Sequence, residues 1–396
     1  MTLKSHPVIA AGHTCLDIIP VFPDDAPTAS LVTPGGMRQV GPAVLATGGS
    51  ATNTGLALHR LGIPVRVMGK VGDDGFGRLI LEHLRSYDPA LAAGMLVAPG
   101  EHSSYTVILS APGMDRAFLH YPGCNDTFCA GDVPDPAPGP GVFHFGYPSL
   151  MRRMYQDGGR ELVALLRRMR ARGLVTSLDM TMPDPNTEAG RVDWPALLAN
   201  LLPHVDLFLP NLEETLFMLE RDRFVRMKSQ GDILPQITGD DLTRLGGRLR
   251  DMGAAIAGLK LGDQGMSLHT TADASHWASL AGALDLDAGA WAGRELLAPA
   301  FRVTLVGATG AGDCAIAGFI AGLLAYRAPE PVLTGAVAVG ACNVEAADAV
   351  SGVPSWEAVQ RRIAAGWEQR PLALKLDGWR WDAPHRLWAG PNDPAG

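Results

Sequence analysis

A glycine-rich segment near the carboxyl end of the chain carries the clearest chemical signal. It runs from Gly307 to Cys314 as Gly-Ala-Thr-Gly-Ala-Gly-Asp-Cys and leads into apolar residues that predict a helix. Gly310 and Gly312 let the backbone approach a ligand closely, and the free N–H groups of a helix start stabilise an anion that develops there. Asp313 would repel a simple phosphate, but it could take the proton of an attacking hydroxyl. The segment therefore indicates phosphoryl transfer to an alcohol.

Two other interpretations of this segment stay open on the residues alone. Asp313 is also the kind of residue that the helix dipole favours in a first turn. The pattern Gly310-x-Gly312-x-x-Ala315 matches the loose dinucleotide-binding fingerprint, although that fingerprint belongs after a first strand and the aspartate would repel a pyrophosphate. No GxxxxGK[ST] segment occurs, which excludes a Walker-type phosphate loop.

The elements that must position this loop alternate regularly along the chain. Apolar residues recur with the helical period within 76–84, 162–169 and 242–252, and short apolar runs between such segments predict buried strands. This alternation predicts an α/β fold with a mostly parallel sheet covered by helices on both faces. The expected strands are Val8–Ala11, Val65–Val67, Gly141–Phe145, Leu174–Leu178, Asp206–Leu209 and Ala255–Leu261.

Some segments interrupt that rhythm within an expected single domain of residues 1–396. Residues 17–47 are rich in Pro, Gly, Val and Thr, and residues 102–121 contain an alternating apolar run with a Pro-Gly turn, which predicts a hairpin. We expect these two segments to form a small β-sheet lid. Residues 270–300 are expected to be an irregular insertion, and residues 367–396 a tail packed on the surface.

Composition restricts the class of protein. The net charge of -8 argues against nucleic acid or an anionic membrane as the main partner. The five cysteines are odd in number and form no CxxC pair, which is typical of free thiols in a reducing compartment. No apolar run is long enough to span a bilayer, and His13 and Asp17 interrupt the apolar start before a signal-peptide core could form. We expect a soluble, cytoplasmic protein.

Six short motifs occur in an order that resembles the ribokinase (PfkB) family of carbohydrate kinases. The resemblance covers roughly residues 8–355, and it rests on the ordered set because each motif is short. The motifs are Gly12-His-Thr-Cys-Leu-Asp17, the di-glycine segment Gly48–Gly62, Gly72-Asp-Asp-Gly-Phe-Gly77, Asn211-Leu-Glu-Glu214, Gly262-Asp-Gln-Gly265 and the loop that ends at Asp313.

Each upstream motif also has a structural interpretation when taken singly. Asn211 and Glu214 have the spacing of a capping box at a helix start. Gly262–Gly265 is typical of a tight turn after a strand. Asp17 could simply end a strand, and the glycines at 48 and 49 could simply lead into a helix.

The resemblance implies a ribokinase-like three-layer α/β/α domain with a β-sheet lid, which uses ATP and Mg²⁺ to phosphorylate a sugar or a related alcohol. It implies that Asp313 is the general base and that an anion hole is formed by Gly310, Ala311 and Gly312. The implied substrate-binding residues are Asp17, Gly48, Gly49 and Asn53. The implied nucleotide-side residues are Asn211, Gly262, Gly265 and Thr309, with Glu214 ordering Mg²⁺ through water.

The chain departs from the family pattern at several points. The loop begins Gly307-Ala308, so it lacks the aspartate with which relatives hold a monovalent cation, and this argues against activation by potassium. The strand that ends at Asp179 lacks the arginine of many relatives, and Lys260 is the nearby alternative cation on the nucleotide side. Cys15 and Ser50 replace residues of ribose-using members, which disfavours ribose. Lid residues expected to shape specificity are Tyr105, Arg116 and Asn125, although Arg116 could equally be a solvated hairpin charge.

Three functions remain open on the sequence. A sugar kinase is the leading hypothesis. A nucleoside kinase would keep the same machinery and add a stacking aromatic side chain, which no residue marks clearly. A non-catalytic sugar-binding regulator is suggested by the altered loop start and the missing arginine, whereas Asp313 argues against it. Because the edges of a lid sheet tend to be covered, a homodimer through the lid is also expected.

Overall fold

Six parallel strands form the centre of the protein. The structure is a computed structural model that describes residues 3–4, 6–23, 34–111 and 117–394. The strands lie in one sheet of ten, and nearly all their residues are buried because helices cover both faces. The expected mostly parallel α/β sheet is confirmed. In spatial order these strands are β12 (Ile256–Lys260), β11 (Leu207–Phe208), β10 (Leu174–Asp179), β9 (Gly141–Gly146), β1 (Val8–Gly12) and β4 (Val65–Met68).

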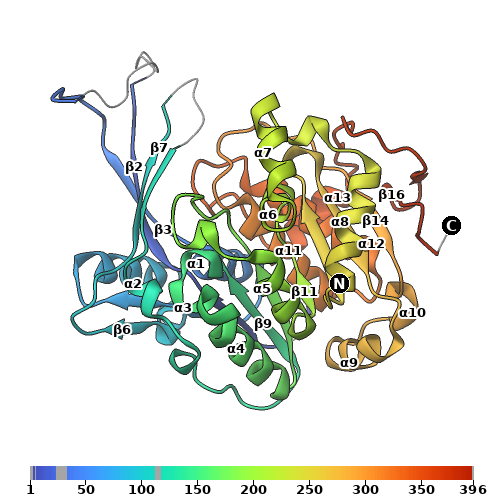
Figure 1. Cartoon of the computed structure of the whole chain (residues 1–396), viewed down its shortest axis with the longest axis horizontal. Helices are drawn as coiled ribbons and strands as arrows, with labels where there is room; N and C mark the ends of the chain where they lie inside the picture. Colours follow the sequence, from blue (N-terminus) through green and yellow to red (C-terminus); the bar gives the residue numbers. More distant parts are fainter. Residues whose placement is uncertain (1–2, 5, 24–33, 112–116, 395–396) are drawn as a thin grey trace.

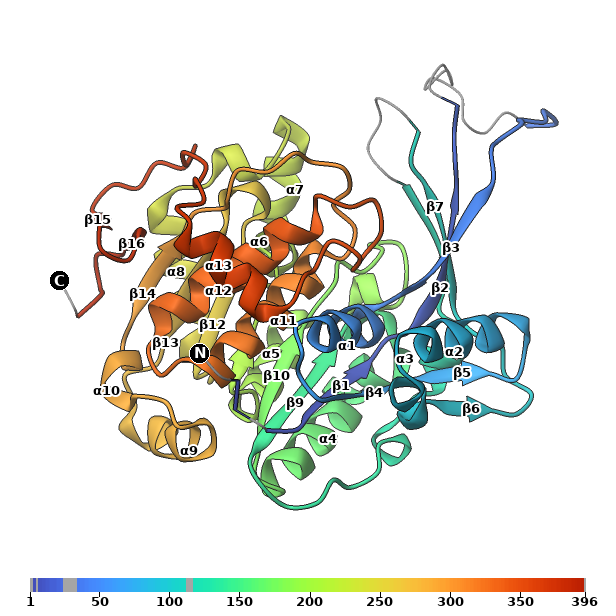
Figure 2. The ribbon, with the colours of Figure 1, turned by 180° about the vertical axis from the view of Figure 1, so that it is seen from behind.

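Helices cover the sheet as two layers, each over its own apolar cluster. Successive strand residues point to opposite faces, so Val8 joins one cluster and Ile9 the other. Figure 1 shows the layer that includes α4 and α8, and Figure 2, from behind, the layer with α11 and α12. The first layer comprises α3 (Arg152–Tyr155), α4 (Arg160–Ala171), α5 (Trp194–Leu201), α6 (Leu212–Leu219), α7 (Arg221–Gln230) and α8 (Gly239–Asp251). The second comprises α1 (Ser50–Arg60), α2 (Gly75–Tyr87), α9 (Ala274–Leu284), α10 (Ala288–Trp291), α11 (Ala311–Ala325), α12 (Pro329–Asn343) and α13 (Trp356–Ala364).

The expected lid is a separate four-stranded sheet that rises beside the main body (Figures 1 and 2). Its order is β3-β2-β7-β8, and β7 and β8 form the expected antiparallel hairpin. The Pro-Gly turn of that hairpin, like Arg116, lies outside the described residues. The lid strands are β2 (Cys15–Pro20), β3 (Ala43–Gly48), β7 (Tyr105–Leu109) and β8 (Ala117–Tyr121), next to a small parallel pair, β5 (Lys70–Gly72) and β6 (Leu96–Ala98).

Residues 270–300 are not irregular, and this expectation is corrected. They form α9, α10 and β14 (Glu295–Ala298), which pairs with β13 (Met266–Thr270) in the main sheet. Two fully buried indoles, Trp277 and Trp291, hold the segment in place with ring centroids 5.6 Å apart. Their N–H groups donate to backbone carbonyls, so the segment is anchored by packing and by hydrogen bonds.

The carboxyl-terminal tail, which was expected to pack on the surface, also forms part of the main sheet. Its strands β15 (Arg380–Asp382) and β16 (Leu387–Ala389) extend the main sheet beyond β14. Asp393 then accepts from Arg294 Nε at 3.0 Å and from the backbone N–H of Glu295 at 2.9 Å. Arg294 also donates to Glu330 at 2.7 Å, so a buried ion-pair network fastens the tail to the sheet and to α12.

This network predicts how the tail contributes to stability. Replacing Asp393 by Ala leaves the buried Arg294 guanidinium short of charge compensation, so we expect the free energy of unfolding to fall by about 3 kcal/mol. Urea denaturation would measure the change. The matched variant Asp377→Ala, at an exposed position of the same tail, should stay within about 0.5 kcal/mol of the parent. Equal stability of the two variants would contradict the proposed fastening.

Candidate active site

The carboxyl ends of the parallel strands bring the predicted site residues to one edge of the sheet. The register pairs Gly12 of β1 with Gly146 of β9, and Gly146 with Asp179 of β10. Asn211, just after β11, bridges to Lys260 at the end of β12. The residues that follow these strands therefore line one edge, where ligands bind in open α/β sheets.

The glycine-rich loop reaches this edge as the start of α11. Gly310 is the N-terminal cap residue, with φ of +71°, and a side chain there would collide with the carbonyl of Ala349. In the described part of the chain no side chain caps the helix, so its first N–H groups remain available to an anion. The interpretation of the loop as a helix start that faces a ligand is thus consistent with its geometry.

Asp313 lies in the first turn of α11 and is only 1% exposed. Its Oδ2 accepts from the Asn53 amide at 2.9 Å and from the Tyr147 hydroxyl at 3.1 Å. Its Oδ1 is buried without a hydrogen-bond partner among the described residues. Burial raises the pKa of this carboxyl, and the hydrogen bond from Asn53 opposes that shift. The carboxylate is thus oriented, with one oxygen left for a ligand.

The four predicted substrate-binding residues lie together beside Asp313. A side chain at Gly48 would collide with the carboxylate of Asp17, and one at Gly49, where φ is +91°, with the backbone of His13. Asn53 stands one turn into α1, where it reaches Asp313. Burial raises the pKa of Asp17 to about 6. Only glycine fits where the chain passes this closely to the acidic side chain.

A row of rings that the sequence did not mark borders the same space. The rings of Tyr147 and His13 lie 6.3 Å apart, and those of His13 and the lid residue His120 lie 5.0 Å apart. The two imidazole Nε2 atoms are 3.3 Å apart. Burial lowers the pKa of His120 to about 4 and that of His13 well below its usual value, so both are neutral near pH 7. His13 lies in the Gly12–Asp17 motif and Tyr147 in none, and the signal that the two share is that both follow neighbouring buried strands.

Other residues singled out from the sequence have partners within the protein. Asn125 is fully buried and binds both backbone groups of Thr14, so it holds the lid base rather than a substrate. Ser50 lies 3.4 Å from His144 Nε2, and the Cys15 thiol donates to Asp17 at 3.4 Å. The ring of Tyr105 packs on Tyr121 of the lid and on Phe76 of α2.

Lys260 faces the loop from the other side. Its Nζ donates to Asp179 at 2.7 Å, and a side chain at Gly312 would come within 3.3 Å of the same Nζ. Nearby carboxylates raise the pKa of Lys260 although burial opposes this, so the ammonium stays charged. Lys260 therefore places a positive charge beside the loop.

The remaining nucleotide-side residues are positioned by turns. Gly262 has φ of +56° and open space around it, two residues after Lys260. A side chain at Gly265 would collide with Ala298, so this glycine is required by the close approach of β14. The carbonyl of Thr309 accepts from the buried Asn343 amide at 2.8 Å, which fixes the loop before Gly310.

The carboxylates on this side fit an outer-sphere role towards magnesium. Both Glu214 oxygens accept from Asn211, at 2.7 Å and 2.6 Å, in a capping box that starts α6. Asp179 Oδ2 is buried without a partner among the described residues. No group of three potential metal ligands occurs in the described part of the chain. Mg²⁺ is usually held by phosphates, waters and one or two carboxylates, so the residues fit a magnesium–nucleotide complex.

Comparison with known proteins decides the family. Residues 8–356 match the pfkB family of carbohydrate kinases. The chain belongs to this family. As a PfkB protein it is a phosphotransferase whose acceptor is an alcohol group.

Solved structures share the fold of this PfkB protein. A fructokinase from Xylella fastidiosa with bound ATP matches at 18% identity and a TM-score of 0.65, covering 91% of this chain and 99% of its own. A ribokinase from Arabidopsis thaliana complexed with ribose and ATP matches at 17% identity and a TM-score of 0.64, and the match covers 90% of this chain and 98% of the ribokinase. A nucleoside kinase from Methanocaldococcus jannaschii matches at 18% identity and a TM-score of 0.60, and the match covers 92% of this chain and 100% of the nucleoside kinase. At these identities the likeness establishes the fold and leaves the acceptor open.

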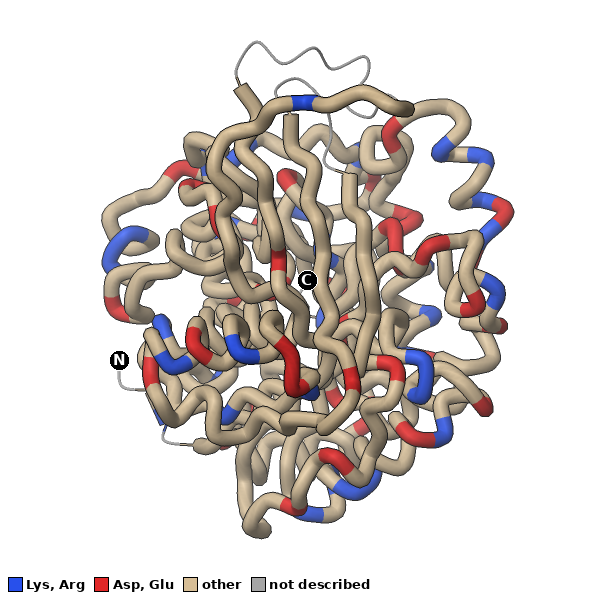
Figure 3. Tube along the Cα trace, turned by 90° about the vertical axis from the view of Figure 1, so that its left-hand side faces the viewer, with Lys and Arg blue, Asp and Glu red and all other residues tan. Residues whose placement is uncertain are grey.

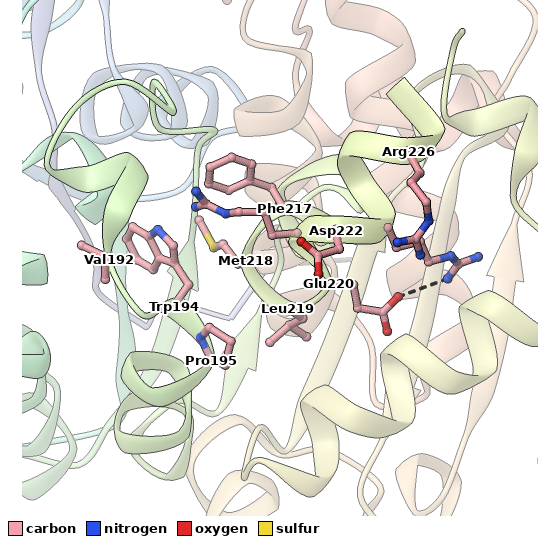
Figure 4. A pocket seen from close by; sticks show the side chains of 11 residues that line it. Val192, Trp194, Pro195, Phe217, Met218, Leu219, Glu220, Asp222 and Arg226 are labelled. Carbon is pink, nitrogen blue, oxygen red and sulfur yellow. Dashed lines mark hydrogen bonds and ion pairs between the residues drawn. The ribbon is translucent and has the colours of Figure 1, made fainter. Parts of the chain in front are cut away.

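A groove elsewhere on the PfkB domain contains none of the predicted residues. Figure 4 shows this hollow of about 580 Å³ between the start of α5 and the junction of α6 with α7. Trp194 and Phe217 are among its lining side chains, and Arg221 lies over the Phe217 ring.

No helix in the described part of the chain is both long and apolar enough to cross a membrane.

The buried carboxylate Glu214 predicts a pH dependence of stability. Burial raises its pKa to about 8, whereas an unfolded glutamate titrates near 4.5. The folded form therefore binds the extra proton between these values, so Glu214 contributes a fall in stability of about 1.4 kcal/mol per pH unit as pH rises towards 8. Urea denaturation in EDTA between pH 6.5 and 8 would measure this contribution as the difference in slope between the parent and Glu214→Gln. The difference is needed because buried histidines such as His144 take up a proton near pH 6.5 on unfolding and add an opposing slope.

The matched variants are neighbours on α6. Glu214→Gln should lack the Glu214 contribution to the slope, because the amide cannot ionise, whereas Glu213→Gln, at a partly exposed position, should keep the slope of the parent. An unchanged slope in Glu214→Gln would show that this group does not carry the extra proton.

Proposed function

We propose that the protein uses ATP and Mg²⁺ to phosphorylate a hydroxyl of a sugar or sugar-like polyol, with Asp313 as general base. The observation that carries the proposal is Asp313 Oδ1, which is buried at the start of α11 with no hydrogen-bond partner among the described residues. Asp17 and Asn53 lie on one side of this carboxylate, and Lys260 faces the loop beside Gly312. A proton acceptor thus stands between groups suited to an alcohol and groups suited to a phosphate.

The residues then have distinct roles in the transfer. The acceptor hydroxyl gives its proton to Asp313 Oδ1 while its oxygen bonds to the γ-phosphorus, and the bond from that phosphorus to the ADP oxygen breaks. The amides of Gly310, Ala311 and Gly312, together with the Lys260 ammonium, stabilise the negative charge on the transferring group. Bound Mg²⁺ would neutralise phosphate charge, with Glu214 and Asn211 holding its water ligands. Gly262, Gly265 and Thr309 would shape the nucleotide side.

The acceptor side favours an uncharged polyol. Asp17 has Asp313 as an acidic neighbour, and in the described part of the chain no Lys or Arg side chain donates a hydrogen bond to it. A carboxylate in this setting needs hydroxyl donors, which a sugar supplies in pairs. The altered loop start at Gly307 argues against activation by a monovalent cation, and five unpaired cysteines favour the cytoplasm.

A second candidate acceptor is a nucleoside. The rings of Tyr147, His13 and His120 form a row beside the catalytic carboxylate, and such rings could stack on a base. Neutral imidazoles also supply one hydrogen-bond donor and one acceptor each, which suits either a base edge or sugar hydroxyls.

A panel of acceptors tests the proposal. The purified protein with ATP and Mg²⁺ should release ADP with at least one of a set of free sugars, polyols and nucleosides. The acceptor that supports turnover then distinguishes the two candidates. Tight sugar binding without ADP above background across the panel would instead indicate a non-catalytic regulator.

Asp313→Asn tests the base within the same assay. We expect kcat to fall at least about 100-fold while the acceptor still binds, because the amide keeps the hydrogen bonds but cannot take a proton. Asp377→Asn, at an exposed position, should retain the parent rate. Unchanged turnover in Asp313→Asn would refute the assignment of the base.

We also propose that the lid forms a homodimer. Its edge strands β3 and β8 each pair with only one strand among the described residues, and exposed apolar side chains stand on both. Figure 3, which faces the lid, shows that its strands carry few charged residues. Val44 and Leu45 are 46% and 47% exposed, and Phe118 and Leu119 are 55% and 58% exposed. Pairing of two lids would cover these side chains.

Sedimentation analysis would test the dimer. We expect the parent to be dimeric at micromolar concentration and Leu119→Lys to shift it towards monomer, because a lysine would have to be buried in the interface. Val225→Lys on α7 is the matched control, since Val225 is also 58% exposed. A monomeric parent, or a dimer unaffected by Leu119→Lys, would contradict this interface.

A further inference from the structure

Tyr147 has a backbone conformation that side chains rarely adopt. It follows β9 directly with φ of 59° and ψ of 43°, in the left-handed region that favours glycine. It also precedes Pro148, a position that favours extended backbone. Such strain persists only where surrounding contacts hold it, and it is concentrated at functional sites. The contacts of the side chain show what the conformation achieves.

The Tyr147 side chain points into the site and reaches the catalytic carboxylate. Its hydroxyl donates to Asp313 Oδ2 at 3.1 Å, beside the Asn53 amide that donates to the same oxygen at 2.9 Å. Two donors on one oxygen fix both the position and the rotation of a carboxylate. They also leave the second oxygen, Oδ1, as the one without a partner in the described residues.

We propose that Tyr147 is a positioning residue: with Asn53 it holds Asp313 by Oδ2, so that Oδ1 is the atom that accepts the proton from the acceptor hydroxyl. The inference rests on the proposed kinase reaction and adds a residue to it. Asn53 was expected to hold the substrate, and in the structure its amide donates a hydrogen bond to Asp313, the proposed base.

The tyrosine hydroxyl keeps the proton that it donates to Asp313. Burial and the nearby carboxylates, Asp313 first among them, raise its pKa well above 10, so the hydroxyl keeps its proton at every working pH. The charged groups around Asp313 are Asp17, Asp179, Glu214 and Lys260. Three of these four are acidic and favour a protonated Asp313. A hydrogen bond to Oδ2 acts in the opposite direction and helps keep the base ionised.

Two histidines, His13 and His120, help to hold the Tyr147 ring in place. His13 lies against Tyr147, and His13 in turn meets His120, whose Nδ1 is 3.0 Å from Thr106 Oγ1 on the next lid strand. The tyrosine therefore has the lid base on one side and Asp313 on the other. This arrangement leaves little freedom for the hydroxyl to leave Oδ2.

Tyr147→Phe removes the hydroxyl and keeps the ring. We expect kcat to fall about tenfold, with a smaller change in KM for the acceptor, because a charged-group hydrogen bond is lost at the base. The acid limb of the kcat–pH profile should also move to higher pH, since Asp313 then ionises less readily. Tyr155→Phe is the matched control: it is a mostly buried tyrosine on α3 that packs on Trp194 away from the site.

Loss of stability alone would lower the rate without moving the pH profile. A Tyr147→Phe variant with the parent kcat and profile, or with lower kcat and an unmoved acid limb, would overturn the proposal.

A second measurement does not depend on finding the acceptor. In protein labelled with ¹³C at aspartate carboxyls, Asp313→Asn identifies the Asp313 signal by its absence. Its titration should move to higher pH in Tyr147→Phe and stay in place in Tyr155→Phe. An unmoved titration would refute the positioning role even if no tested alcohol were phosphorylated, whereas a shift with no turnover would leave that role standing and count against the kinase proposal.

Discussion

The site depends on burying several carboxylates against one ammonium group. Asp179, Glu214 and Asp313 lie within electrostatic reach of Lys260, which binds only the first of them directly. Desolvation raises the pKa of all three carboxyl groups, and the Lys260 ammonium opposes that shift. Further positive charge, as in the proposed magnesium–nucleotide complex, would favour the ionised carboxylates in the same way.

Close helix packing fixes the position of Asp313, the proposed base. A side chain at Gly318 would press on Val339, and one at Gly322 on Val332, so α11 and α12 approach each other through glycines. The polar start of α11 then has no freedom to tilt away from the strand ends. Buried helices with nearly uniform apolar surfaces show weak periodicity, because both neighbours and the sheet contact them. The same packing that hides the helix pattern makes the catalytic turn rigid.

The sequence predicted those parts whose signal is local. Apolar periodicity located the parallel strands and α2, α4 and α8, and the Gly-Ala-Gly-Asp loop located the start of α11. The regular structure of residues 270–300 was not predicted, because it depends on Trp277 and Trp291, whose packing partners lie elsewhere in the sequence. The role proposed for Tyr147 was not predicted for a similar reason. A single tyrosine after a strand has no spacing to recognise, and its role follows from the register of β9 with its neighbours and from a left-handed backbone.

The acceptor side of the site is built into the lid itself. Asp17 stands on β2, whose first three residues are buried at the lid base while the last three are partly exposed in the projecting sheet. Across the lid, Cys15 pairs with Gly48, the glycine that lies against the Asp17 carboxylate. His120 extends the same contact from β8 to His13 and so to Tyr147. A movement of the lid would therefore shift Asp17 and the histidines behind Tyr147 together, which couples the proposed substrate-binding residue Asp17 to the proposed base Asp313.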